Sequence, residues 1–129
     1  MTRITAQGRP KRSAESKNVP AAQGLLIQQY LDQLWMEKGA SAHTLAAYGT
    51  DLRKFASFLH SRDLPLAQAD ADLLNLYLAH RHDAGLQARS TARALSSLRN
   101  FYQWLYQRQI IADNPLSSIL NPKIGLSLP

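Results

Sequence analysis

Apolar residues recur every three or four positions in four separate stretches of the chain, which is the spacing of amphipathic helices. The clearest stretch is residues 87–108, QARSTARALSSLRNFYQWLYQR. One side of this predicted helix carries the apolar residues Leu95, Leu98, Phe101, Tyr102 and Leu105. The opposite side carries the polar residues Arg89, Arg93, Ser96 and Asn100. We therefore predict a helix that packs through one face and leaves a basic, polar face open.

Three earlier stretches predict three further helices, at residues 25–38, 43–60 and 70–85. The first is expected to bury Ile27, Tyr30, Leu31, Leu34 and Trp35. The second is expected to bury Leu45, Tyr48, Leu52, Phe55 and Leu59. The third is expected to bury Leu73, Leu76, Tyr77 and His80. The pattern thus favours four long helices in two consecutive hairpins, with no strand.

Residues that commonly end or begin helices stand at the predicted boundaries. Gly39 suits a helix C-terminus, and Ser41 suits the N-cap of the second helix. Asp70 or Asp72 is expected to cap the third helix, and Pro115 suits the first turn of a short helix at 115–120.

The predicted boundaries divide the chain into three parts. Residues 1–23 form a flexible basic tail, residues 24–120 form one all-α domain, and residues 121–129 form a linker.

The charge is unevenly distributed along the chain. Fifteen Lys and Arg against nine Asp and Glu give a formal net charge of +6. Residues 1–23 hold five of the cations and one acid, which is +4 of that total. In the rest of the chain, the stretch between Asp83 and Asp113 contains four arginines and no acid. A negatively charged partner is therefore expected on the open face of the fourth helix.

The second helix repeats this arrangement. Its outward face carries His43, Thr50, Arg53, Lys54 and Ser57, with Asp51 as the one acid. Cations with hydroxyl and amide donors suit phosphates and base edges, so the two faces together predict DNA binding. The simpler interpretation is that these two helix faces are exposed to solvent and bind nothing. A third interpretation is a protein-interaction module. Trp104 falls at the edge of the open face, where it would either contact a partner or be covered by the C-terminal segment.

Catalytic and cofactor chemistry find little support in the sequence. The chain has no cysteine, and its His80 and His82 are spaced so that they point in different directions on a helix. The glycines are scattered and form no nucleotide-binding loop. We expect no metal, no cofactor and no active site within these residues. No apolar run is long enough to span a membrane, so a cytoplasmic protein is expected.

Three segments carry a resemblance to a known family. They are YLDQLWMEKGASAHTLAAYGTDLRKFASFL, STARALSSLRNFYQWLYQRQIIADNP and the ending PKIGLSLP. Together they resemble the N-terminal core-binding domain of the Xer-type tyrosine recombinases, within the phage integrase family. The resemblance covers residues 25–129. The basic tail before Gln23 is longer than the resemblance explains, and Gly49 stands where relatives often carry a basic residue.

This resemblance implies a SAM-like bundle of two crossed hairpins whose second and fourth helices enter the DNA major groove. By matching position, the implied DNA contacts are Ser41, His43, Thr44, Arg53, Lys54, Arg89, Ser90, Arg93, Ser96, Ser97 and Arg99. Tyr48 and Tyr102 would be core residues, since the family's nucleophilic tyrosine belongs to a separate catalytic domain.

The implied role is to clamp a double-stranded half-site without cutting it. Related recombinase protomers would join it in a tetrameric synaptic complex, resolving chromosome dimers at a dif-type site during segregation. An integrase of a mobile element would share the domain and differ in target.

Overall fold

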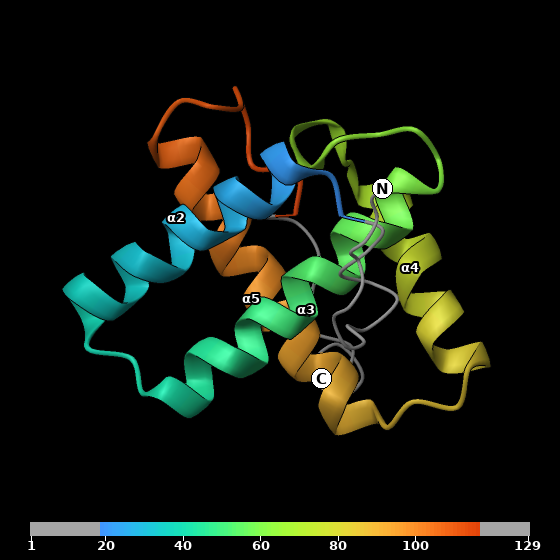
Figure 1. Ribbon diagram of the computed structural model, residues 1–129. Coiled ribbons are helices and arrows are strands. Elements are labelled where there is room, and N and C mark those ends of the chain that lie inside the picture. The colour runs from blue at the N-terminus through green and yellow to red at the C-terminus, as the bar shows by residue number, and fades with distance from the viewer. Residues whose placement is uncertain (1–18, 117–129) are drawn as a thin grey trace, which may run out of the picture.

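Two helical hairpins lie across each other in the part of the chain that the computed structural model describes, residues 19–116 (Figure 1). The elements are α2 (Ala21–Lys38), α3 (Ala42–His60), the short 3-10 helix η2 (Leu66–Gln68), α4 (Ala71–Asp83) and α5 (Ala88–Gln107). Within these residues there is no strand. Figure 1 shows α5 crossing behind α3, with α2 and α4 on opposite sides of the crossing. The predicted all-α class is confirmed.

The turn between α2 and α3 forms as its residues predict. Gly39 adopts the left-handed conformation, with φ of 63°, and its N–H donates to the carbonyl of Trp35. The hydroxyl of Ser41 then accepts the N–H of Thr44 at 3.1 Å and caps α3. Both signals stop one helix and start the next within a few residues, which brings the two helices together as a hairpin.

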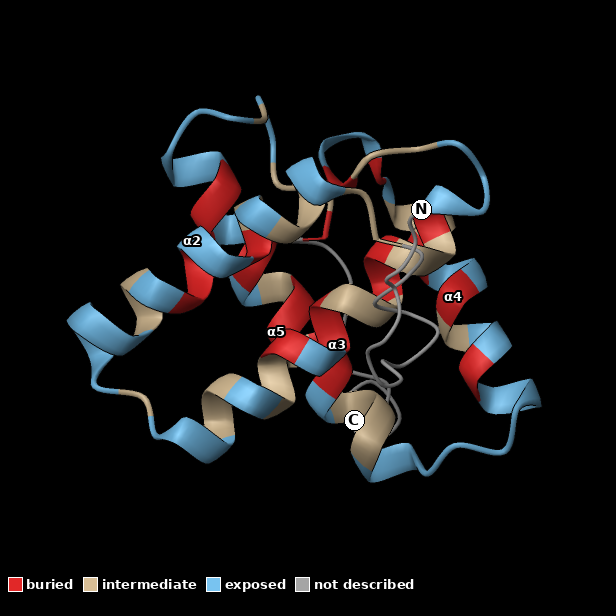
Figure 2. Ribbon diagram, viewed as in Figure 1, coloured by how far each residue is buried: buried red, intermediate tan, exposed pale blue. Residues whose placement is uncertain are grey.

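The core lies where α5 meets α2 and α3. The predicted apolar stripe of α5 is entirely buried, since Leu95, Leu98, Phe101, Tyr102 and Leu105 have no exposed surface. Figure 2 shows buried residues gathered at this meeting, while the outer turns of α2 are exposed. Each such side chain contributes about 1.5–3 kcal/mol when fully buried. The packing face of α5 is thereby fixed, and so is the direction of its opposite face.

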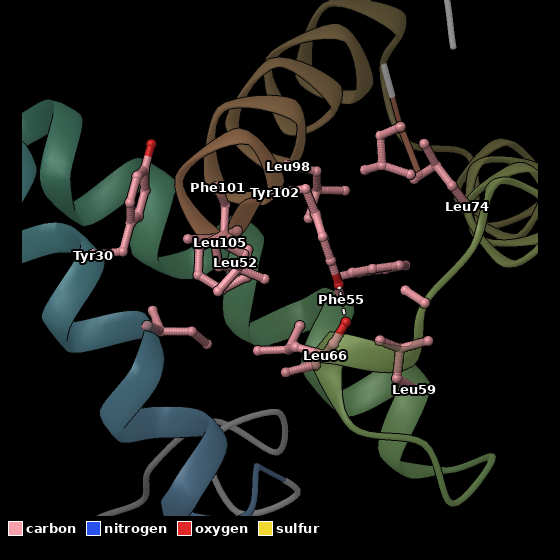
Figure 3. Close-up of a cluster of buried hydrophobic side chains, with 14 of the residues drawn as sticks. Tyr30, Leu52, Phe55, Leu59, Leu66, Leu74, Leu98, Phe101, Tyr102 and Leu105 are labelled. Atoms are coloured by element: carbon pink, nitrogen blue, oxygen red, sulfur yellow. Dashed lines mark hydrogen bonds between the residues drawn. The ribbon is translucent and has the colours of Figure 1, made fainter. Parts of the chain in front are cut away.

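The connector between the hairpins is tied to the core through Leu66. This residue is fully buried, and its N–H donates to Oε1 of Gln23 at 2.8 Å. Its carbonyl accepts the hydroxyl of Tyr102 at 2.7 Å, the bond drawn in Figure 3. Burial raises the pKa of Tyr102 well above its ordinary value. Tyr102 is therefore a core residue, as predicted.

The first helix differs from its prediction in two respects. It begins at Ala21, four residues before the predicted start, directly after Pro20. Its buried face consists of Ile27, Tyr30 and Leu31, whereas Trp35 is 61% exposed. The prediction that Trp35 packs in the core is therefore wrong.

The buried face of α4 is also displaced from the predicted one. Asp70 caps the helix by accepting the N–H of Leu73 at 2.8 Å. The residues it buries are Leu74, Tyr77 and Arg81. Of the predicted set, Tyr77 is buried, Leu73 is half-buried, and Leu76 and His80 are exposed. At the C-terminal end of the buried face, Arg81 is therefore buried in place of the predicted His80.

The C-terminal end of the described chain folds back toward α5. The side-chain oxygen of Asn114 accepts the N–H of Leu116, and its amide nitrogen donates to Gln103. Pro115 and Leu116 lie in a turn. Most of the short helix predicted at 115–120 falls outside the described residues.

Candidate nucleic-acid interface

The open face of α5 is positioned by the burial of its other side. Arg89, Arg93 and Asn100 are exposed, and Ser96 is half-buried. No acidic residue lies on α5. The helix therefore presents cations, a hydroxyl and an amide along one side, as the sequence predicts.

Arg93 is held by a carboxylate on the crossing helix. Its Nε donates to Oδ2 of Asp51 at 3.0 Å, and its Nη2 donates to Oδ1 at 2.7 Å. Asp51 is 2% exposed, while the side chain of Arg93 is 46% exposed. The hydrogen bond to Asp51 raises the pKa of Arg93, so the guanidinium stays charged. These bonds use Nε and Nη2, and the guanidinium as a whole remains partly exposed.

Asp51 therefore does not lie on the outward face of α3, where the sequence pattern placed it. It is buried at the α3–α5 crossing, and Ser97 also donates to its Oδ2, at 2.9 Å. A buried carboxylate needs hydrogen-bond donors, and these come from two side chains of α5. The ion pair removes the one acid from the predicted face of α3.

Ser97 has a structural role in this network. It is fully buried, and its hydroxyl also approaches the carbonyls of Arg93 and Ala94. A side chain with no exposed surface is not available to a DNA ligand in this conformation. We therefore leave Ser97 out of the contact surface proposed below.

The N-terminal end of α3 places three candidates close together. The Ser41 hydroxyl caps the helix and also donates to the hydroxyl of Thr44 at 3.1 Å. Ser41 and His43 are exposed, and Thr44 is half-buried. The cap fixes the direction of this first turn, so these groups lie together at the start of α3.

Arg53 and Lys54 lie further along α3 and are both half-buried. A Cβ atom added to Gly49 would lie 3.1 Å from both terminal nitrogens of Arg53 and 3.2 Å from Leu31. The Arg53 guanidinium thus lies where a side chain at position 49 would begin. The glycine leaves room for a cation from the next helical turn.

The first turn of α5 is linked to α4 by a residue that the sequence pattern missed. Arg81 is 3% exposed, and it donates to Thr91 Oγ1 and Ser90 Oγ, each at 3.0 Å. Ser90 is therefore a candidate contact that also has an internal partner. Arg81 follows Tyr77 by four residues and Leu74 by seven, so all three lie on the same side of the helix. The sequence could have indicated its burial, but the prediction considered apolar residues only. Arg99, the last candidate on α5, is half-buried and has interactions within the chain.

Trp104 belongs to the core and not to the open face. It is 7% exposed, and its indole N–H donates to Oε1 of Gln33 on α2 at 2.8 Å. Its ring also lies 5.4 Å from that of Tyr30 and 5.9 Å from that of Phe101. Helix α2 covers Trp104, so an interaction surface built on this side chain finds no support.

Residues 19–116 contain neither a cluster of metal ligands nor a helix suited to span a membrane. No group of three or more His, Cys, Asp or Glu residues in this range could hold a metal ion. None of the helices in the same range is both long and apolar enough to cross a membrane.

Comparison with known proteins gives the class of this domain. Residues 27–109 match the family described as phage integrase, N-terminal SAM-like domain. The chain belongs to this family. No solved structure matches the chain.

Individual relatives are recombinases named XerD. The chain is 40% identical over 111 residues to the tyrosine recombinase XerD of Pseudomonas putida, covering 86% of the chain and 37% of that protein. It is 43% identical to XerD of Shewanella oneidensis, covering 81% of the chain and 35% of the relative. It is 35% identical to XerD of Proteus mirabilis, covering 99% of the chain and 39% of the relative. The chain therefore spans little more than a third of the length of these relatives.

Proposed function

We propose that this chain is the DNA-binding N-terminal domain of a tyrosine site-specific recombinase, gripping a double-stranded half-site through α3 and α5. The observation that carries the proposal is the pair of crossed helices, joined by the Asp51–Arg93 ion pair at 2.7 Å. Both helices turn cations and short polar side chains away from a shared core. Such side chains bind phosphates and read base edges in a groove wide enough for a helix.

The proposed contact surface consists of the candidates that have exposed or half-exposed side chains. They are Ser41, His43, Thr44, Arg53, Lys54, Arg89, Ser90, Arg93, Ser96 and Arg99. Arg93 stands at the crossing of the helices, so its guanidinium is presented in a fixed orientation. An arginine held in this way loses little side-chain freedom when it binds a phosphate or a guanine edge.

The whole protein's role is inferred from the relatives. We infer that it breaks and rejoins DNA strands through a catalytic domain outside these 129 residues, and that this domain binds without cutting. The XerD names of the relatives favour a cytoplasmic recombinase that resolves chromosome dimers at a dif-type site, together with an XerC-like partner in a tetramer. A mobile-element integrase would prefer a different half-site, which a comparison of the two duplexes distinguishes.

A salt titration of half-site binding tests the proposal. Each phosphate contact contributes about −0.9 to the slope of log K against log salt. Lys54→Ala and Arg93→Ala should each weaken binding to a dif-type duplex and make the slope shallower by about that amount. Fluorescence anisotropy over a salt series measures both quantities.

The design needs two controls. Arg93→Ala also leaves the buried Asp51 without its cation, so Arg89→Gln provides a change on the same face that should spare the fold. Arg108→Gln removes a cation beyond the far end of α5, above the ring of Trp104, and should leave the slope unchanged. Wild-type affinity and slope in Lys54→Ala, Arg89→Gln and Arg93→Ala would rule out the proposed interface.

A further inference from the structure

A second basic site lies between α3 and α4, beside the proposed interface. It is a cleft of about 530 Å³, and none of its lining residues within the described part of the chain is acidic. Its basic lining residues are Lys54, Arg62, His80 and Arg81. Lys54 belongs to the proposed contact surface as well, so the cleft continues that surface toward α4.

Arg81 makes this cleft unusual. The side chain is 3% exposed, yet its hydrogen bonds go to the hydroxyls of Ser90 and Thr91. Within residues 19–116 the ion pair found is that between Arg93 and Asp51, and no carboxylate pairs with Arg81. A buried cation without a counter-ion is unfavourable, and a nearby anion offsets that cost.

The other walls of the cleft supply groups suited to such an anion. The Arg62 guanidinium lies 4.4 Å from the centre of the Phe58 ring, and both residues line the cleft. The imidazole of His80, on α4, lies 5.9 Å from the same ring. The hydroxyl-bearing Ser57 also lines the cleft. Cations together with hydroxyl donors are the usual partners of a phosphate group.

We infer that the basic cleft between α3 and α4 binds a phosphate group. The inference rests on the proposed function, under which that phosphate is a backbone phosphodiester of the bound half-site. Lys54 and Ser90 connect the two sites, because Lys54 lines the cleft and Ser90 accepts from Arg81. The DNA backbone then passes from the α3–α5 face into the cleft, and α4 contributes to DNA binding without entering a groove.

Arg62→Gln in the full chain tests this inference. Arg62 is exposed, so the substitution should leave the fold intact, and thermal unfolding checks that it does. One lost phosphate contact should make the salt slope shallower by about 0.9. If Arg62→Gln and the wild type bind equally at 1 M salt, the variant should bind the half-site about eightfold more weakly than the wild type at about 0.1 M salt. Arg108→Gln is the matched control and should bind as the wild type does.

The outcomes separate this inference from the proposed function. If the wild type binds the half-site and Arg62→Gln keeps the same affinity and slope, the cleft does not take a backbone phosphate. If the wild type shows no salt-dependent DNA binding, the proposed function itself fails.

Titration with inorganic phosphate then tests the cleft alone. Amide chemical shifts should move at Ser57, Arg62 and Arg81 in the wild type and not in Arg62→Gln. Absence of these shifts in the wild type, together with an unchanged DNA slope in Arg62→Gln, overturns the inference.

Discussion

Neighbouring serines on α5 have opposite surroundings, which shows how finely one helix divides its residues between core and surface. Ser96 is half-buried on the open face, whereas Ser97 is fully buried and donates to Asp51. The resemblance to the recombinase family pointed to both as contacts, because matching positions carry no information on burial. The carboxylate that accepts the hydrogen bond from Ser97 belongs to Asp51 on α3, 46 residues earlier in the chain. Sequence periodicity along α5 alone could not reveal that partner.

Alanine substitution of these two serines should therefore give opposite results. Ser97→Ala removes a buried hydrogen bond to a carboxylate, and we expect it to lower the free energy of unfolding by about 2 kcal/mol. Its effect on the salt slope of DNA binding should be negligible. Ser96→Ala should leave stability within about 0.5 kcal/mol and weaken half-site binding.

Urea unfolding and anisotropy, run on both variants, check this pair of expectations. Loss of DNA affinity in Ser97→Ala at unchanged stability would show that Ser97 reaches the DNA after all.

Helix positions were largely predictable from the sequence, and the apolar face was predicted well on α3, where Leu52, Phe55 and Leu59 are buried, and best on α5. Its stripe from Leu95 to Leu105 is continuous, apolar and entirely buried. On α4 the stripe is completed by Arg81, a charged residue that an apolar pattern does not count. The two tryptophans were predicted in the wrong environments. Trp35 was expected in the core and is exposed, whereas Trp104 was expected at the edge of the open face and is buried beneath α2. The early start of α2 is stabilised by Gln23, whose partner Leu66 lies 43 residues further along the chain.

The link between α3 and α5 is open to a double-mutant test. Asp51→Asn and Arg93→Ala should each destabilise the fold, since either change breaks a partly buried ion pair. Because both substitutions remove the same interaction, the double variant should be more stable than the sum of the two effects predicts, by about 1–2 kcal/mol.

Chemical denaturation of the four proteins gives this coupling energy, and Asp32→Asn on the exposed side of α2 serves as the charge-matched control. Strict additivity would mean that the pair does not hold the helices together.

At the scale of the whole molecule, net charge was a weaker guide than the placement of charge. Residues 1–23 carry +4 of the formal +6, so the total says little about the folded domain. The informative features are the acid-free α5, the burial of Asp51, and the cleft beside Arg81. The sequence indicated the first of these. The burial of Asp51 and the cleft beside Arg81 depend on contacts between helices, which the sequence pattern of a single helix does not contain.

The two proposed sites together define one continuous surface, extending from the start of α3 across the crossing to the cleft at α4. The α2 residues Asp32 and Trp35 line a pocket with Arg53, so α2 borders this surface on the side away from α4. The chain belongs to the phage integrase N-terminal SAM-like domain family, and it matches 37% of the length of the Pseudomonas putida XerD. A DNA duplex bound as proposed would contact α3, α5 and the wall of the cleft, and would leave the outer side of α2 untouched.

Mapping of amide chemical shifts during titration with a dif-type half-site tests this account most directly. The account predicts that the shifts concentrate at residues 41–54 of α3 and 89–99 of α5, and that they diminish as salt is raised. Shifts that instead concentrate on α2, or that persist unchanged at high salt, would contradict it.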